Sequence, residues 1–139
     1  MKLLIIDNFD SFTYNIVQII EQLSSVKYSV VKHDRLNIDD VNQFDKILFT
    51  PGPGLPEEHP IMEKVIKQYS ASKSILGICL GHQLLALAAG GRTYKLPYGH
   101  RSQNQPVMDL LTRRAYVTSQ NHGYAVELDS LPEHWKPWF

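Results

Sequence analysis

Residues 74–89 read SILGICLGHQLLALAA, and no other stretch indicates the fold class as strongly. Its first part, 74–78, is a short apolar run typical of a buried strand. The part from about Gly81 to Ala89 has the length and apolar content of a helix, which Gly90-Gly91 would end. Between them stands Gly77-Ile78-Cys79-Leu80-Gly81, a glycine–x–nucleophile–x–glycine turn with cysteine as the nucleophile. The stretch therefore predicts a strand, a sharp turn that presents Cys79, and a helix.

The chain before this stretch repeats the alternation of strand and helix. Apolar residues 3–6 end at Asp7-Asn8, and residues 28–33 and 45–50 are expected to form two further strands. Two helices are expected between the strands, one capped by Ser11 with apolar Phe12, Ile16, Ile19, Ile20 and Leu23, the other with Ile61, Val65 and Ile66. This order predicts an α/β fold with a mainly parallel sheet flanked by helices on both faces. Ligands of such sheets bind at the carboxyl ends of the strands.

The pattern changes after Gly91. Residues 92–96, 104–109, 115–119 and 124–128 are expected to form short strands separated by turns, with more polar side chains than the strands before them. Such strands are typical of a partly exposed antiparallel extension. We expect the whole chain, 1–139, to be one domain.

Composition excludes several classes of protein. The 139 residues carry 14 basic and 14 acidic side chains, so the formal net charge is zero, and no basic stripe indicates a nucleic-acid or membrane partner. Cys79 is the single cysteine, which excludes an internal disulfide and a metal cluster built on cysteines. We expect no metal and no cofactor, and a small neutral or zwitterionic substrate. Without a signal peptide or a membrane span, the chain is expected to be cytoplasmic.

Two motifs carry chemistry. Cys79 at a helix N-terminus is expected to have a lowered thiol pKa, with the Leu80 N–H aimed at an oxyanion. The alternative is an inert buried cysteine between two packing glycines. Pro51-Gly52-Pro53-Gly54 follows the strand at 45–50. Taken alone it is more typical of a rigid surface turn than of a loop whose N–H groups approach a substrate.

Together these motifs resemble the triad-type, or class I, glutamine amidotransferases, which implies a flavodoxin-like fold. Residues 7–15 (DNFDSFTYN), 51–54 (PGPG) and 77–83 (GICLGHQ) carry the resemblance. Up to about residue 83 the chain is similar to the glutaminase component of anthranilate synthase or aminodeoxychorismate synthase. From about Leu84 it is similar to the small subunit of carbamoyl-phosphate synthetase, at residues 90–96, 98–101, 104–107 and 119–126.

The resemblance implies a role for eight residues. Cys79 would be the nucleophile, and the N–H groups of Gly54 and Leu80 would form the oxyanion hole. The expected substrate contacts are Gly52, Gly54, Gln83, Asn121, Gly123 and Tyr124. For Gln83, a helix residue that caps a neighbouring loop is an equal alternative. The resemblance makes none of His82, His100 and His122 the base.

The sequence departs from the family pattern at its end. The family places a His-x-Glu pair on a late strand, and no such pair follows Asn121. The closing strand and helix would come after Phe139. We therefore expect a domain truncated at its C-terminus, with doubtful activity on its own; a truncated gene, a chimera and a natural pseudo-enzyme all remain open.

The expected function is hydrolysis of L-glutamine through a Cys79 thioester, with ammonia passed to a larger synthase subunit. That subunit would be the chorismate-using one of anthranilate or aminodeoxychorismate synthase. The first alternative is the small subunit of carbamoyl-phosphate synthetase, whose partner forms carbamoyl phosphate. The second is a catalytically impaired glutamine-binding or regulatory subunit. A third alternative, a cysteine peptidase or esterase, is supported only by the turn at Cys79.

Overall fold

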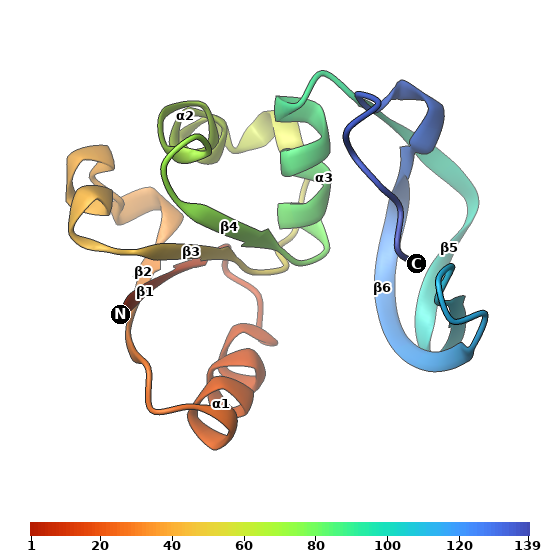
Figure 1. Ribbon diagram of the computed structural model, residues 1–139, viewed down its shortest axis with the longest axis horizontal. Helices are drawn as coiled ribbons and strands as arrows, with labels where there is room; N and C mark the ends of the chain where they lie inside the picture. The colour runs from red at the N-terminus through yellow and green to blue at the C-terminus, as the bar shows by residue number, and fades with distance from the viewer. The chain divides into compact units, whose positions relative to one another are not determined.

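The computed structural model describes residues 1–139, which divide into two compact units, Met1–Ala88 and Ala89–Phe139 (Figure 1). None of the helices has the length and apolar character needed to cross a membrane.

The first unit is built on a four-stranded parallel sheet in the order β2-β1-β3-β4 (Figure 1). The strands are β1 (Lys2–Asp7), β2 (Lys27–Lys32), β3 (Lys46–Phe49) and β4 (Ser74–Gly77). Their ends lie within one residue of those expected from the apolar runs. The parallel sheet predicted from the sequence is thus confirmed.

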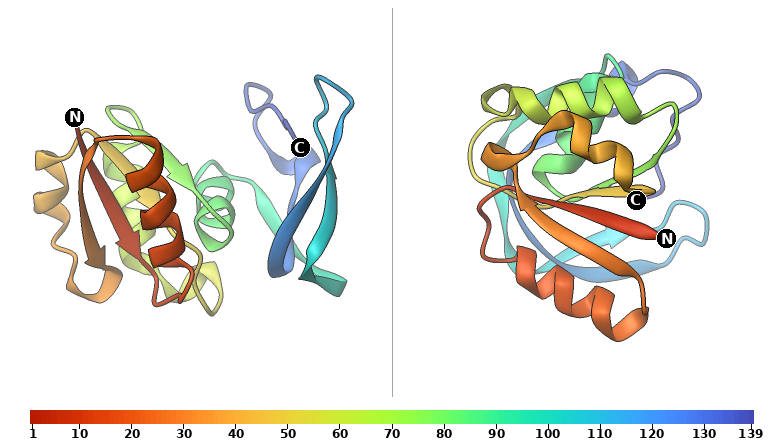
Figure 2. Two further views of the ribbon diagram at one scale, coloured as in Figure 1. Left: turned by 90° about the horizontal axis from the view of Figure 1, so that it is seen from below. Right: turned by 90° about the vertical axis from the view of Figure 1, so that its left-hand side faces the viewer.

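Helices cover both faces of this sheet, as predicted (Figure 2). On one face lies α1 (Thr13–Leu23), and on the other lie α2 (Pro60–Tyr69) and α3 (Leu80–Ala88). Strand residues alternate between the faces: Leu4 and Ile6 pack toward α2 and α3, while Ile5 packs toward α1. The short 3₁₀ segments are His33–Arg35, Ile38–Gln43, Pro56–Glu58 and Leu128–Ser130.

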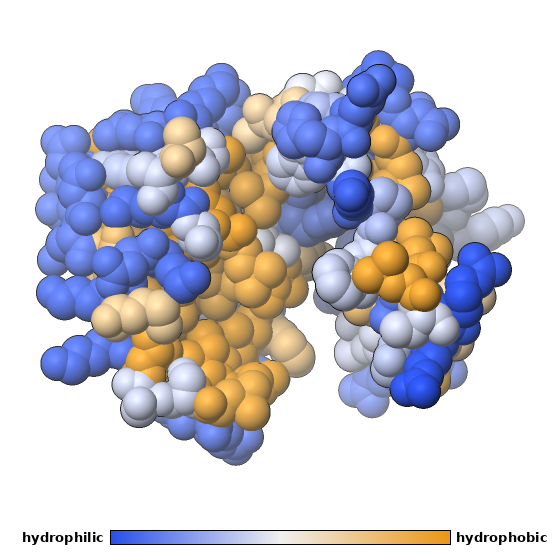
Figure 3. Space-filling model, in the orientation of Figure 1, coloured by the Kyte–Doolittle hydropathy of each residue, from blue (hydrophilic) through white to orange (hydrophobic).

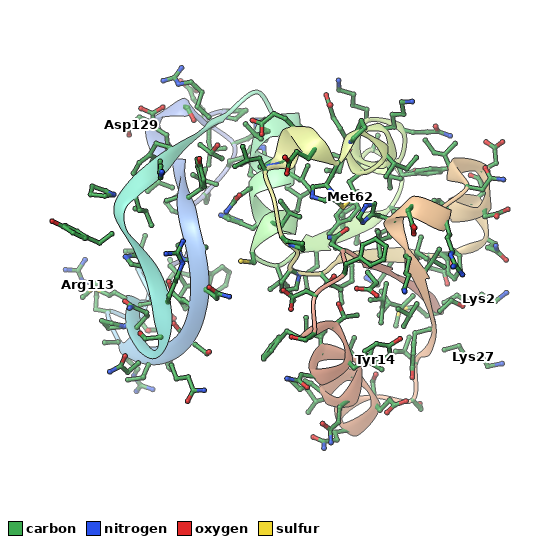
Figure 4. All side chains as sticks on the ribbon, turned by 180° about the vertical axis from the view of Figure 1, so that it is seen from behind. Lys2, Tyr14, Lys27, Met62, Arg113 and Asp129 are labelled. Carbon is green, nitrogen blue, oxygen red and sulfur yellow. The ribbon has the colours of Figure 1, made fainter.

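Most of the core lies on the side of α2 and α3. Met62 of α2 is fully buried and points into the layer between the helix and the sheet (Figure 4). Phe49, at the end of β3, is the largest fully buried side chain. This packing fixes the end of β3 against the start of α3, where the cysteine stands.

The start of α1 differs from the prediction. Ser11 does not cap the helix; instead the Asp10 carboxylate accepts a hydrogen bond from the N–H of Phe12 at 2.7 Å, and the Asp10 carbonyl accepts one from Thr13 at 3.2 Å. The N-cap position is held by Phe12, so no side chain caps the helix, and Asp10 fixes the turn just before it. Of the predicted apolar stripe, Ile16 is buried, whereas Leu23 is exposed.

The second unit is a single long hairpin instead of the four short strands expected. Strand β5 (Arg92–Met108) pairs antiparallel with β6 (Ala115–Glu127), so residues 97–103 and 120–123 lie in strands. The register shifts twice, between Lys95 and His100 and between Ser102 and Gln105, and both shifts place the extra residues in β5. Pro97 and Gly99 lie within the first of these register shifts, so both fit inside β5, although the sequence pattern predicts a turn there.

The end of the chain returns to the turn of this hairpin. The N–H of Leu110 donates to the Trp138 carbonyl at 2.8 Å. The buried Asp109 carboxylate accepts the N–H groups of Leu111 and Thr112, and its pKa is lowered mainly by Thr112, with the Trp138 side chain contributing. Arg113, labelled in Figure 4, has a left-handed backbone (φ 60°) in this turn.

Candidate active site

The carboxyl ends of β1 and β3 are joined by a buried polar network. The N–H of Asn8 donates to the Thr50 hydroxyl at 3.1 Å, and the Asn8 amide donates to the Thr50 carbonyl at 2.8 Å. The Thr13 hydroxyl donates to the Asp7 carboxylate at 2.9 Å. All four side chains are buried. These hydrogen bonds hold the two strand ends side by side, although the Asn8 Oδ1 atom is buried without a partner.

Residues Pro51–Gly54, here called the PGPG loop, pack on this network and on α3. A β-carbon on Gly52 would lie 2.5 Å from the Asn8 Cβ and 3.0 Å from the Leu80 Cδ2. Gly54 has φ +84°, which favours glycine. The loop is therefore seated against the residue that follows Cys79, and is more than the free surface turn that the motif alone favours.

The turn at Cys79 has the geometry of a strained nucleophile elbow. Cys79 has φ +56°, a left-handed conformation that is rare for a residue other than glycine. A β-carbon on Gly77 would lie 2.3 Å from the Gly81 carbonyl carbon, and one on Gly81 would lie 2.6 Å from the Phe49 Cβ. The N–H of Ile78 donates to the Phe49 carbonyl at 3.0 Å, which ties the turn to the end of β3. Gly77 and Gly81 are therefore required at this turn, as the motif predicts, because a side chain at either position would clash with neighbouring atoms.

The thiol itself differs from the prediction. Burial raises the pKa of Cys79 above its ordinary value, the Leu80 backbone N–H opposes this by favouring the thiolate, and the charge of Asp10 raises it further. The expectation of a lowered pKa considered only the helix N-terminus. The half-buried position of the side chain and a nearby carboxylate outweigh that effect.

Leu80 and Gln83 are fixed by the first turn of α3. Both are buried, and the N–H of Gln83 donates to the Cys79 carbonyl at 3.1 Å. The first unit thus places Leu80 and Gln83 on the helix that follows Cys79 and Gly52 against Leu80, while Gly54 lies beside Glu58 and His59.

Asn121, Gly123 and Tyr124 belong to β6 of the second unit. Tyr124 pairs with Lys95, and Gly123 lies in the register shift between this pair and that of His122 with His100. Asn121 stands opposite Arg101, and a β-carbon on Gly123 would lie 3.3 Å from the Arg101 Nη2. Their role as substrate contacts stays a prediction.

Two of the three histidines considered above lie side by side on the hairpin. The rings of His100 and His122 meet edge to face, with centroids 5.1 Å apart. Both approach the Gln120 Oε1 atom, at 3.2 Å from His100 Nδ1 and 2.9 Å from His122 Nε2. These are structural hydrogen bonds within the second unit. No group of three or more His, Cys, Asp or Glu side chains is placed to hold a metal ion.

A different histidine, which was not predicted from the sequence, contacts the PGPG loop. His59 is buried, and its Nε2 atom lies 3.0 Å from the Pro53 carbonyl of this loop. One feature of the sequence could have indicated this contact: His59 follows Gly54 by five residues and directly precedes the proline that begins α2.

Comparison with known proteins places this geometry in a family. Residues 4–139 match the model of the family described as glutamine amidotransferase class-I. The chain is 49% identical over 100 residues to a carbamoyl phosphate synthase arginine-specific small chain of Aspergillus clavatus, covering 70% of this chain and 22% of the relative. It is 47% identical over 116 residues to a carbamoyl phosphate synthase small chain of Caldanaerobacter subterraneus, covering 81% and 33%. A carbamoyl-phosphate synthase [ammonia] of Aquarana catesbeiana is 48% identical over 100 residues, covering 70% and 7%.

The chain spans a third or less of the length of these curated relatives. Their names match the resemblance found from Leu84 onward, and so favour the carbamoyl-phosphate alternative over the anthranilate and aminodeoxychorismate synthases expected first.

Solved structures show the same fold. A GMP synthase subunit of Thermoplasma acidophilum superposes with a TM-score of 0.77 at 22% identity, covering 96% of this chain and 69% of that one. A glutamine amido transferase of Methylobacillus flagellatus gives 0.58 at 19% identity, covering 91% and 56%. The flavodoxin-like amidotransferase fold is thereby confirmed. With its nucleophile elbow, its PGPG loop and the match of the family model, the chain belongs to the class I glutamine amidotransferases.

Proposed function

We propose that this chain is the amidotransferase part of a carbamoyl-phosphate synthase small chain. It would hydrolyse L-glutamine and pass ammonia to a larger synthase subunit that forms carbamoyl phosphate, in the cytoplasm. The support is the identity of 47–49% to small chains of that name, over 70–81% of this sequence. An anthranilate or aminodeoxychorismate synthase has the N-terminal motifs alone in its favour.

The observation that carries the proposal is the left-handed Cys79 between two glycines that leave no room for a β-carbon. In the proposed reaction the Cys79 sulfur forms a bond to the side-chain amide carbon of glutamine. The carbon–nitrogen bond then breaks, and nitrogen leaves as ammonia after gaining a proton. Water attacks the resulting thioester, which releases glutamate and returns the thiol. The N–H groups of Gly54 and Leu80 would stabilise the oxyanion in both steps.

Binding of the α-amino and α-carboxylate groups of glutamine would fall to Gly52, Gly54, Gln83, Asn121, Gly123 and Tyr124. The raised pKa of Cys79 means that attack requires a proton acceptor. The resemblance assigns that task to a His-x-Glu pair, and none of the six histidines is followed by such a glutamate. We therefore propose that residues 1–139 alone bind glutamine and turn it over slowly.

A second candidate is a glutamine-binding or regulatory subunit without turnover. Two observations favour it: burial raises the pKa of the Cys79 thiol, and a relative named for ammonia is as similar as those named small chains. Turnover with a partner subunit separates the two candidates.

The test is a glutaminase assay of the chain alone, with a large subunit of carbamoyl-phosphate synthase, and with a large component of anthranilate synthase. We expect glutamate release to rise only with the first partner, and to vanish in Cys79→Ser. Stimulation by the anthranilate component would overturn the choice of pathway. Glutamine binding without turnover under all three conditions would favour the second candidate.

A further inference from the structure

The PGPG loop is hydrogen-bonded to His59, which lies at the junction of two helical segments. His59 ends the 3₁₀ segment Pro56–Glu58 and precedes α2, so its backbone is fixed on both sides. Its side chain is only 7% exposed. Because the Pro53 carbonyl can only accept, the His59 Nε2 atom carries the hydrogen of their 3.0 Å hydrogen bond.

The other nitrogen of this ring is left without a partner. The Nδ1 atoms of His59 and His33 are both buried, and neither has a hydrogen bond. The two rings meet edge to face with centroids 4.9 Å apart, and the Phe9 ring packs on His33 in the same way at 5.0 Å. A buried side chain with an unsatisfied nitrogen is costly to keep, which indicates that its one hydrogen bond matters.

A second contact holds the next residues of the loop. The Glu58 carboxylate accepts the N–H of Leu55 at 2.8 Å. The same carboxylate oxygen lies 2.2 Å from the place where a β-carbon of Gly54 would stand. Residues 53 to 55 are thus held from one side by His59 and Glu58, while Gly52 is seated on Asn8 and Leu80.

We propose that His59 is a positioning residue, which holds the PGPG loop against Leu80, the residue after Cys79, through its hydrogen bond to the Pro53 carbonyl. The hydrogen bond limits rotation of the loop's peptide groups and so fixes the directions of the N–H groups that the loop offers. An oxyanion donor is effective only when it is preorganised. The inference rests on the proposed function, because it presumes that an N–H group of this loop serves an oxyanion at Cys79.

Several charged side chains lie near the His33 ring, which packs on His59. Burial and the neighbouring His59 lower the pKa of His33, while the carboxylates of Asp34 and Asp7 act in the opposite direction. The Lys32 ammonium lies over the outer Phe9 ring, 5.0 Å from its centroid. The Glu58 carboxylate is engaged by the N–H of Leu55. Burial thus favours the neutral form of the His33 ring that packs on His59.

The experiment compares two alkylating probes of Cys79 in the full 139-residue chain. A glutamine-derived diazoketone presents its ketone oxygen where the amide oxygen would bind, whereas iodoacetamide does not require the oxyanion donors. The variants are His59→Asn, whose amide cannot reach the Pro53 carbonyl, and His59→Gln, whose amide nitrogen replaces Nε2. Glu58→Ala, at an exposed side chain, keeps the test valid if His59→Asn does not fold.

We expect His59→Asn to slow the diazoketone about 10- to 100-fold, below the full loss of a donor. Labelling by iodoacetamide should stay within about twofold, since the thiol is unchanged. His59→Gln should restore the diazoketone rate, and Glu58→Ala should slow it selectively. Equal slowing of both probes, or no slowing in His59→Asn and Glu58→Ala, overturns the inference. If excess glutamine fails to protect Cys79 in the unmodified chain, the proposed function fails instead.

Discussion

Gly77 and Gly81 approach each other so closely that a β-carbon on Gly77 would fall 2.3 Å from the carbonyl carbon of Gly81. The atoms that such a β-carbon would meet belong to the backbone, which cannot move aside as the end of a flexible side chain could. Replacing Gly77 or Gly81 by alanine should therefore destabilise the first unit by about 1–3 kcal/mol or more.

Thermal and urea unfolding measure this loss. The matched control is Gly90→Asn, because Gly90 has a left-handed backbone that asparagine tolerates and nothing lies within 4 Å of an added β-carbon. Unchanged stability in Gly77→Ala would contradict the close approach of strand and helix at the elbow.

Burial raises the pKa of Cys79 and the charge of Asp10 raises it further, which favours the protonated thiol. We expect iodoacetamide labelling to accelerate with pH, through a midpoint above that of an ordinary thiol. Asp10→Asn removes the like charge and retains a side-chain acceptor for the Phe12 N–H. It should lower the midpoint and speed labelling at a mildly alkaline pH.

Glu63→Gln is the control for general charge, since Glu63 is exposed on α2 and pairs only with Lys67. It should leave the labelling rate unchanged. A midpoint below that of a free thiol, or identical rates in Asp10→Asn and the unmodified chain, would show that another group governs the thiol.

Thr50 joins the ends of β1 and β3, because its hydroxyl accepts from the Asn8 N–H at 3.1 Å and donates to the Pro51 carbonyl at 3.0 Å. Valine has the same shape without the hydroxyl. Thr50→Val leaves two buried polar groups unpaired and should cost about 1–3 kcal/mol of unfolding free energy. Thr93→Val, at a half-buried position of β5, should cost much less, and a similar cost at both sites would argue against the network.

Strand β4 is an edge of the sheet, and Leu76 on it is 61% exposed. Figure 3 shows apolar side chains gathered over the middle and lower part of the first unit. Exposed strand edges and apolar patches favour association. We expect residues 1–139 to self-associate at micromolar concentration, and Leu76→Lys to shift them toward monomer in size-exclusion chromatography.

Leu111→Lys is the control for this prediction, because Leu111 is 70% exposed but lies in the hairpin turn of the second unit. A chain that stays monomeric at all concentrations, or equal effects of the two variants, would exclude β4 as the association surface.

The sequence predicted the elements whose pattern is local. The buried run at 74–78 and the glycines around Cys79 report directly on close packing, and the structure has both. The hairpin of the second unit was misjudged, because its proline and glycine at 97 and 99 are absorbed by irregularities in β5 that depend on pairing with β6.

The site was predictable only where motif and family pattern agree. The pKa of Cys79 depends on burial and on Asp10, which is 69 residues away in the chain, so the local pattern of the turn predicted the wrong direction. His59 was missed because its place shortly after the PGPG loop does not show by itself that the ring turns back to the Pro53 carbonyl. The His33 ring that packs on it comes from a distant part of the chain.

Attack of Cys79 on the side chain of glutamine can be tested by mass spectrometry of the labelled chain. The chain is treated with a glutamine-derived diazoketone in the presence and absence of excess L-glutamine, with D-glutamine as the control. We predict a single adduct on Cys79, which L-glutamine suppresses and D-glutamine does not. Labelling of Cys79 that is equally fast with and without L-glutamine would contradict the assignment of glutamine as the substrate.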